Sequence, residues 1–319
     1  MSESIAKIDA YRARRMGEML VSADQVASFT QEPKDLLLDL AGLDGRELLN
    51  QYRAKNAQFA SAPFDPSGDK LRFYPGGVTI WSGHPGAGKS TILRQFICHT
   101  LHRGSSVFVA SLEEDPRDIP IELAATACGC EEPNAHQVQW LLDEYQSRLR
   151  IWSTIGIARR SEMIGAIQYL AGKGIRHYVI DSLMRLDVAT DNTEAQREFA
   201  NTLSTVARIN GIHIHLVAHP RKPSKDADTS DQNEVGGARE LIGIADNILF
   251  IRRRKDLVQY MDAEVTPMAI TISKQRKNRG KLGSIDGWFH RKFRQFSHDQ
   301  FREQPARYLP NDAFVELRA

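Results

Sequence analysis

The stretch Gly83-His84-Pro85-Gly86-Ala87-Gly88-Lys89-Ser90 reads G-x-x-x-x-G-K-S, the pattern of a phosphate-binding loop. Residues 77–82 before it form a short apolar run that predicts a buried strand. Residues 91–101 after it carry apolar side chains at helical spacing, and Gly104 is a suitable C-cap. A strand, a glycine-rich turn and a helix in this order aim backbone N–H groups and the positive end of the helix at a phosphate. A chance glycine-rich turn would not need these flanks and is the weaker interpretation.

The residue types in this loop indicate which ligand it holds. Lys89 should reach the β- and γ-phosphates, and the Ser90 hydroxyl should bind Mg²⁺. We therefore expect ATP and Mg²⁺ as ligands. The residues expected to contact the nucleotide are Gly83, His84, Pro85, Gly86, Ala87, Gly88, Lys89, Ser90 and Thr91.

The overall composition limits the classes to which the chain can belong. Its 319 residues suffice for one large α/β domain plus an accessory segment, and a net charge of +2 leaves any nucleic-acid affinity to local patches. No apolar run approaches the ~20 residues of a membrane span, and no signal-peptide core is visible. Three cysteines, Cys98, Cys128 and Cys130, fit a reducing cytoplasm. Cys128 and Cys130 could form a metal or redox pair, but a zinc site would need a second pair of ligands.

The chain changes character near residue 66. Residues 1–66 are polar, carry apolar residues mostly at helical spacing and lack the apolar content of an independent core. We expect a helical N-terminal linker or docking arm there, with the turn-rich stretch 62–68 as the boundary. One domain should then occupy residues 67–319.

Strands and helices alternate after the loop, which predicts an α/β fold with a mostly parallel sheet flanked by helices. Beyond residue 280 the pattern changes to short antiparallel pieces, with Gly283 and Gly287 expected at turns. The expected strands span residues 106–111, 177–181, 212–218, 247–251 and 268–273, and the expected helices span residues 119–128, 137–149, 161–171 and 195–210.

Two of the expected strands end in acidic residues. Ligands sit at the carboxyl ends of strands in an open parallel sheet, so Asp181 can hold Mg²⁺ directly or through water. The strand over 106–111 leads into Glu113 and Glu114, either of which could orient the water that attacks the γ-phosphate; we favour Glu113. Helix capping by Asp181 and a solvated acidic turn at 113–114 are the alternatives.

A histidine and a long polar loop follow the strand expected over 212–218. His219 could hydrogen-bond the γ-phosphate and report its loss to the next loop, although a lone histidine after a strand is more often structural. Residues 221–236 have no apolar periodicity, and a long loop inside a compact domain is usually functional. Its candidate nucleic-acid contacts are Arg221, Lys222 and Lys225, opposed by Asp226, Asp228 and Asp231.

Lys274 and Arg276 lie one residue apart at a strand end, so both side chains can point to the same side. This pair suits charge stabilisation of a γ-phosphate, in the same subunit or in a neighbour. Between residues 274 and 294 there are eight basic residues and one acid, Asp286, a run that is usually a solvated face.

Together these motifs resemble the RecA-like P-loop ATPase core of superfamily 4 hexameric helicases: the bacterial DnaB type, the phage primase-helicase type and the mitochondrial helicase Twinkle. The resemblance covers about residues 75–295. The His-Pro-Arg-Lys run is most similar to Twinkle and phage helicases, and the Lys-Gln-Arg run to the DnaB type. The specific marks are Ser111-Leu112-Glu113, His219-Pro220-Arg221-Lys222, Gly236-Gly237-Ala238, Ala245-Asp246-Asn247 and Ser273-Lys274-Gln275-Arg276.

The resemblance implies roles for the strand-end residues. Glu113 would be the catalytic carboxylate, Asp181 the Walker B acid and His219 the phosphate sensor. Lys274 and Arg276 would complete a neighbour's ATP site, and the loops after Asp181 and His219 would line a channel for single-stranded DNA.

The resemblance implies an ATP-dependent, ring-forming DNA helicase of replication that moves along single-stranded DNA with 5′–3′ polarity. It would form a homo-oligomer, by resemblance a hexamer. It would bind other replication proteins in the cytoplasm of a bacterial or phage-infected cell. Within these 319 residues we expect no Cys-rich zinc module, no primase domain and no globular N-terminal domain, as in a short phage- or plasmid-type helicase or a helicase domain cut from a longer chain. Two alternatives stay open: a RecA/RadA-like filament ATPase that binds DNA without unwinding it, and a KaiC-like regulatory ATPase that does not bind DNA.

Overall fold

The computed structural model describes residues 43–182, 185–186, 193–218, 239–254, 256–257, 264–277 and 281–314. The chain divides into two units, Met1–Ala57 and Gln58–Ala319. In the first unit the described part contains helix α3 (Gly45–Ala57), which exposes Leu48, Leu49 and Tyr52. Its role as a linker or docking arm stays a prediction.

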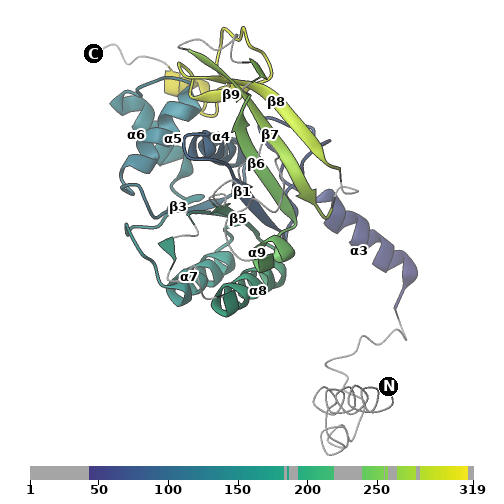
Figure 1. Cartoon of the computed structure of the whole chain (residues 1–319). Helices are drawn as coiled ribbons and strands as arrows, with labels where there is room; N and C mark the ends of the chain where they lie inside the picture. The colour runs from purple at the N-terminus through teal and green to yellow at the C-terminus, as the bar shows by residue number, and fades with distance from the viewer. Residues whose placement is uncertain are drawn as a thin grey trace, which may run out of the picture. The chain divides into compact units, whose positions relative to one another are not determined.

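Within the described residues, a nine-stranded sheet forms the centre of the second unit, in the order β3-β2-β4-β5-β1-β6-β7-β8-β9 (Figure 1). Neighbours from β3 to β6 pair in parallel, and neighbours from β6 to β9 pair antiparallel. The predicted mostly parallel core with an antiparallel C-terminal extension is therefore confirmed. The strands are β1 (Val78–Ser82), β2 (Val107–Ser111), β3 (Leu149–Ile151), β4 (His177–Asp181), β5 (His213–Ala218), β6 (Asn247–Arg253), β7 (Val265–Gln275), β8 (Gly283–His290) and β9 (Gln295–Ser297).

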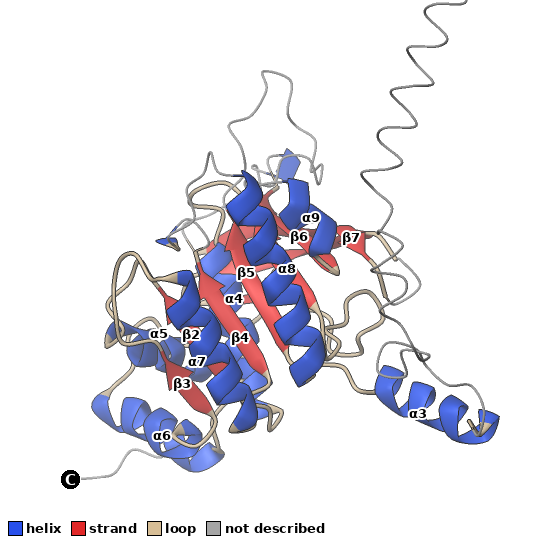
Figure 2. Cartoon of the chain, turned by 90° about the horizontal axis from the view of Figure 1, so that it is seen from below, coloured by secondary structure: helices blue, strands red, loops and turns tan. Residues whose placement is uncertain are grey.

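Helices cover both faces of the parallel part, and Figure 2 shows α7 and α8 on the near side of the strands with α4 behind them. The central strand β1 explains why both faces are apolar. Val78 and Ile80 pack into the core under α7 and α8, whereas Trp81 packs into the core under α4 and α5. The helices are α4 (Lys89–His102), α5 (Asp118–Cys128), α6 (Ala135–Tyr145), α7 (Arg160–Gly172), α8 (Thr193–Asn210) and α9 (Arg239–Ile244), with a 3-10 turn η5 (Asn311–Phe314).

The helix expected over residues 137–149 is shorter, and a strand follows it. Asn134 starts α6 with a capping box, because its side chain accepts from the Gln137 N–H while the Gln137 side chain accepts from the Asn134 N–H. The helix ends at Tyr145, and Leu149–Ile151 pair in parallel with β2. The prediction was wrong here because a three-residue strand is too short to show an alternating pattern.

The sequence predicts a turn at Gly287, but the structure places this residue inside β8, opposite Met268 of β7. A Cβ at this position would lie 2.5 Å from both the Phe296 ring and the Ser297 carbonyl oxygen. The glycine is needed because β9 folds tightly over β8 at this point, and not because the chain reverses there.

The turn-rich stretch expected to separate an arm from the domain is part of the core. Ala62 and Phe64 are buried, and the Asp65 carboxylate accepts hydrogen bonds from the Lys70 and Leu71 N–H groups at 2.9 and 2.7 Å. Proline, glycine and aspartate here shape a buried turn, so the compact unit starts at Gln58 and not at residue 67.

In the described part of the chain, no helix is both long and apolar enough to cross a membrane. All three cysteines are free thiols, and Cys98 and Cys128 are buried. Among the same described residues, no group of three or more His, Cys, Asp or Glu side chains is arranged to hold a metal ion.

Candidate nucleotide site

The glycine-rich loop joins β1 to α4, and its conformation depends on two glycines. Gly88, the N-cap of α4, has φ of 90°, in the left-handed region that favours glycine. Gly83 lies against β6, and a Cβ there would approach the Ile251 carbonyl oxygen to 2.3 Å. The loop can therefore close over the strand ends only with glycine at these positions.

Lys89, the first residue of α4, folds back over the loop. Its ammonium donates to the carbonyl oxygens of Gly83 at 2.7 Å and His84 at 3.2 Å. Burial lowers the pKa of Lys89, and the nearby carboxylates of Asp181 and Glu113 oppose that shift. The positive charge is thus already at the place where a phosphate would arrive, held by two carbonyls that a phosphate can replace.

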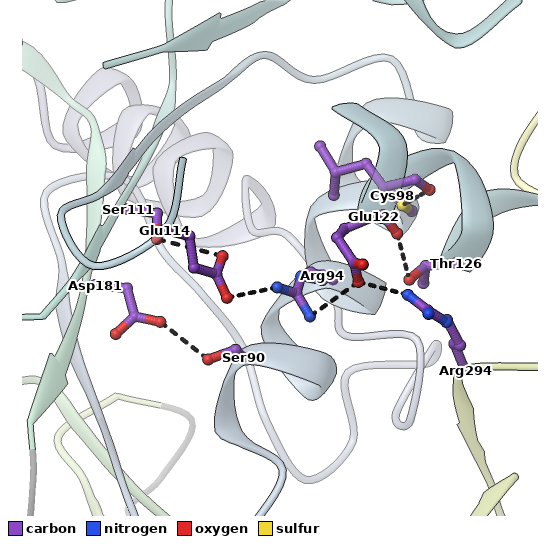
Figure 3. Close-up of polar contacts among 10 residues, drawn as sticks. Ser90, Arg94, Cys98, Ser111, Glu114, Glu122, Thr126, Asp181 and Arg294 are labelled. Atoms are coloured by element: carbon purple, nitrogen blue, oxygen red, sulfur yellow. Dashed lines mark hydrogen bonds and ion pairs between the residues drawn. The ribbon is translucent and has the colours of Figure 1, made fainter. Parts of the chain in front are cut away.

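Ser90 and Asp181 meet at the carboxyl end of β4. The Ser90 hydroxyl donates to Asp181 Oδ2 at 3.1 Å (Figure 3). Burial raises the pKa of Asp181 to about 6, with Glu114 and Glu113 adding to the shift and the Ser90 hydrogen bond opposing it. A hydroxyl and a carboxylate are oxygen ligands of the kind Mg²⁺ takes, and phosphate sites use only one or two from the protein, so these two residues fit the expected metal.

The structure distinguishes the two glutamates that follow β2. Glu114 turns toward α4, where it accepts from Arg94 at 2.7 Å (Figure 3). Glu113 lies over the end of β4, where it accepts from the Ser182 hydroxyl at 3.1 Å and from Arg185 at 3.4 Å. Glu113 keeps 41% of its side chain exposed and shares its edge of the sheet with Asp181, so it is better placed than Glu114 to hold a water.

A pocket of about 440 Å³ lies beside the loop and is lined by residues 86–91. Its opposite wall comes from β6 and from the antiparallel extension, and the sequence analysis missed all of it. No local pattern marks these side chains, because only strand pairing brings them near the loop. They are Arg253, Thr266, Met268, Phe289 and Arg291.

Comparison with known proteins agrees with this arrangement. Residues 69–225 match the family model described as an AAA domain. A solved structure titled as an ATPase domain aligns with 81% of this chain and 100% of its own, with a TM-score of 0.66 at 17% identity. A second structure, titled as a DnaB-like replicative helicase and its interactions with primase, aligns with 92% of this chain and 76% of its own, with a TM-score of 0.61 at 17% identity. This chain therefore shares the fold of these two structures.

In this fold, Lys274 and Arg276 lie far from the loop of their own chain. Lys274 sits opposite Ile248 at the start of β6, whereas the loop leaves the sheet at the other end of the neighbouring β1. Both side chains point the same way, as the sequence predicts. Lys274 donates to the Ile242 carbonyl and Arg276 to the Gly243 carbonyl, at the C-terminal end of α9, where the helix dipole favours cations.

Five expectations lie partly or wholly outside the described residues. These are the sensor role of His219, the nucleic-acid contacts of Arg221, Lys222 and Lys225, and the loop over 221–236. They stay predictions.

Proposed function

We propose that this chain is an ATP-driven DNA helicase of replication that works as a homo-oligomeric ring. The helicase fold and the titles of the two similar structures support the class of activity. The observation that carries the proposal is the division of the site between the two ends of the strands. At the carboxyl ends of the parallel strands lie Lys89, Ser90, Glu113 and Asp181, whereas Lys274 and Arg276 lie at the opposite ends.

Within one chain, the gathered residues suit hydrolysis of a nucleoside triphosphate. Lys89 would exchange its two carbonyl partners for β- and γ-phosphate oxygens. Ser90 and Asp181 would hold Mg²⁺, which when bound neutralises phosphate charge. Glu113 would orient the attacking water, since its carboxylate lies over the end of β4 and is half exposed.

Lys274 and Arg276 cannot serve the ATP bound by their own chain, because the strand register separates them from its loop. A second copy that presents its loop to the α9 end of this chain would receive both cations. Each ATP would then be hydrolysed between two copies, with the charge that develops on the γ-phosphate met by a neighbour's Arg276. A repeated head-to-tail contact of this kind closes into a ring or extends into a filament.

The DNA-binding part of the proposal comes from the family resemblance. His219 would sense the γ-phosphate, and the loops after Asp181 and His219, with Arg221, Lys222 and Lys225, would hold single-stranded DNA. The protein would move along the DNA strand in the 5′–3′ direction.

Mixing two inactive variants tests the shared site. Lys89→Ala should lose hydrolysis because it cannot hold the phosphates, and Arg276→Ala should lose hydrolysis while still binding nucleotide. Mixed oligomers contain some interfaces with an intact loop on one side and an intact Arg276 on the other, so mixing should restore part of the ATPase rate. If Arg276→Ala alone keeps full DNA-stimulated turnover, the shared site is wrong.

Unwinding of forked duplexes tests the helicase activity. A fork with a single 5′ tail should be opened in the presence of ATP, and a fork with a single 3′ tail should not. Mass measurement with ATP separates a closed ring from a growing filament. DNA binding with ATP hydrolysis but no unwinding, on an open filament, would replace the helicase proposal by the RecA-like alternative.

A further inference from the structure

Four charged side chains form a continuous series of ion pairs between the segment after β2 and the C-terminal extension (Figure 3). Arg94 on α4 donates to Glu114 at 2.7 Å and lies 3.3 Å from Glu122 on α5. Arg294, between β8 and β9, pairs with the same oxygen of Glu122. Arg94 is the least exposed member, at 19% of its side chain, and it contacts both acids.

Arg94 ties α4 to the segment that carries Glu113. It lies one helical turn after Ser90, on the same face of the helix. Ser90 contacts the end of β4 through Asp181, and Arg94 contacts the segment after β2 through Glu114. The first two turns of α4 therefore fix the ends of both strands that bear the acidic residues.

The backbone at Glu113 is held on both sides. On one side, the Leu112 N–H donates to the Asp181 carbonyl at 2.7 Å, and the Leu112 carbonyl accepts from Gly156 N–H at 2.9 Å. On the other side, Glu114 is paired with Arg94, which among the described residues is its one cationic partner. The Glu113 side chain is half exposed and accepts from Ser182 and Arg185 at 3.1 and 3.4 Å, so a shift of the backbone on either side would move its carboxylate away from these partners.

We propose that Arg94 is a positioning residue for the ATPase reaction, which holds Glu114 so that Glu113 faces the γ-phosphate. The inference rests on the proposed function. Glu122 and Arg294 orient the Arg94 guanidinium from the side away from Glu114. Because these two residues carry opposite charges, the series of four side chains is neutral as a whole. Because Arg94 holds the water-positioning segment and not the loop, its loss should slow the chemical step and leave nucleotide affinity unchanged.

The test compares steady-state ATPase kinetics and the binding of a non-hydrolysable ATP analogue. Arg94→Met should lower kcat by about 10- to 100-fold, the cost of a displacement on the order of 1 Å at a reacting group, with KM and analogue affinity within about twofold of wild type. Arg94→Lys should recover part of the loss, since a lysine keeps the charge but not the planar fork. Glu144→Gln is the matched control: it breaks an ion pair of the same kind, with Arg148 at 2.9 Å, that contacts none of the four residues, and it should keep kcat near wild type.

Glu114→Gln tests the same pair from the other side and decides the matter if Arg94→Met fails to fold. Its kcat should fall as far as that of Arg94→Met, and the double variant should lose little more, because both changes break one contact. Unchanged kcat in either single variant, a rise in KM that accounts for the loss, or additive losses in the double variant would overturn the inference. If wild-type protein hydrolyses no ATP, the proposed function fails; if wild type and Arg94→Met hydrolyse equally, only the inference fails.

Discussion

Lowering the pH from 7.5 to 5.5 should destabilise the folded chain by at least about 3 kcal/mol, chiefly because three histidines are buried together in the core. His177 on β4 and His213 and His215 on β5 are 6%, 2% and 0% exposed. Their rings are stacked or tilted against one another, with centroids 4.6–6.1 Å apart. An added proton on any of them would place a charge inside an apolar, aromatic cluster.

The hydrogen bonds of the cluster fix neutral rings. Trp81 donates its indole N–H to His215 Nδ1, so His215 carries its proton on Nε2 and donates it to His177 Nδ1, 3.2 Å away. His213 Nδ1 lies 2.7 Å from the Tyr74 carbonyl and must donate, which leaves its Nε2 to accept from the Thr79 hydroxyl. A second proton on His215 or His213 would face a donor and break these bonds.

The magnitude follows from the pKa shifts. Burial lowers the pKa of His177 to about 3 and of His213 to about 4, and it lowers the pKa of His215 well below the ordinary 6.5. In the unfolded chain these rings take up protons as the pH falls through 6.5, but in the folded chain they do not. Their stabilising effect is complete above 6.5 and is lost toward the folded pKa values, at about 1.4 kcal/mol per ring by pH 5.5.

One buried group acts in the opposite sense. The pKa of Asp181 is raised to about 6, so its protonation between pH 7.5 and 5.5 favours the folded state by about 1 kcal/mol. Three histidines at about 4 kcal/mol in total, less this amount, leave a loss of about 3 kcal/mol, a large share of the 5–15 kcal/mol typical of a folded domain. His99, whose pKa burial lowers to about 4, adds to the loss in the same sense.

Urea unfolding curves at several pH values measure the effect. His215→Gln removes one titrating ring while its amide can still accept from Trp81, so about 1.4 kcal/mol of the acid-induced loss should disappear. Ile167→Val in α7 is the control, since it lowers stability through lost packing in the other core cluster and should leave the pH dependence as in wild type. The reasoning is refuted if His215→Gln and wild type lose equal stability between pH 7.5 and 5.5, or if the cluster's imidazole NMR signals titrate near 6.5 in the folded protein.

Three further outcomes follow from the structure. Lys89→Ala should reduce ATPase activity to background, because the ammonium expected to bind the phosphates is lost. The far-ultraviolet circular dichroism should stay native, since that ammonium contacts carbonyl oxygens of the loop and not a helix or a strand. Glu113→Gln should lose about 100-fold or more in kcat with ATP still bound, and more than Glu114→Gln loses. A larger loss for Glu114→Gln than for Glu113→Gln in a steady-state assay would favour the second glutamate. Gly287→Ala should destabilise by about 1–3 kcal/mol in thermal unfolding, because its Cβ meets the Phe296 ring at 2.5 Å, whereas Gly165→Ala in α7, with no atom within 4 Å, should be neutral or stabilising.

The phosphate-binding loop and the acids at the strand ends could be predicted from the sequence because each depends on neighbouring residues. A glycine-rich turn needs Gly83 and Gly88 at fixed spacing, and a buried parallel strand is a continuous apolar run that ends where polar ligand-binding residues begin. The same pattern placed Asp181 at the end of β4, where it meets Ser90. Local chemistry at these positions and the tertiary contact point to the same residues.

The rest of the site depends on pairings that no local pattern records. Phe289 and Arg291 reach the pocket because β8 pairs with β7, which pairs with β6 beside the loop strand. Arg94 looks like an ordinary polar residue of a helix, and its role is visible only once the ends of β2 and α5 lie against α4. A turn signal was also misleading at residues 62–65, since proline and glycine mark a change of direction whether or not the chain is buried there.

The charges around the loop bear on the proposal that ATP is hydrolysed between two copies of the chain. Three carboxylates, Glu113, Glu114 and Asp181, converge at the carboxyl edge of the sheet, and Glu114 is already neutralised by Arg94. Lys89 is the cation that the loop itself supplies to this edge, and a triphosphate would bring several more negative charges. Mg²⁺ at Ser90 and Asp181 would offset part of that charge, and Arg253 and Arg291 line the pocket beside the loop. Arg276 lies at the opposite ends of the strands, and under the proposed function a neighbouring chain would bring it to the γ-phosphate, where it would add a guanidinium as charge develops.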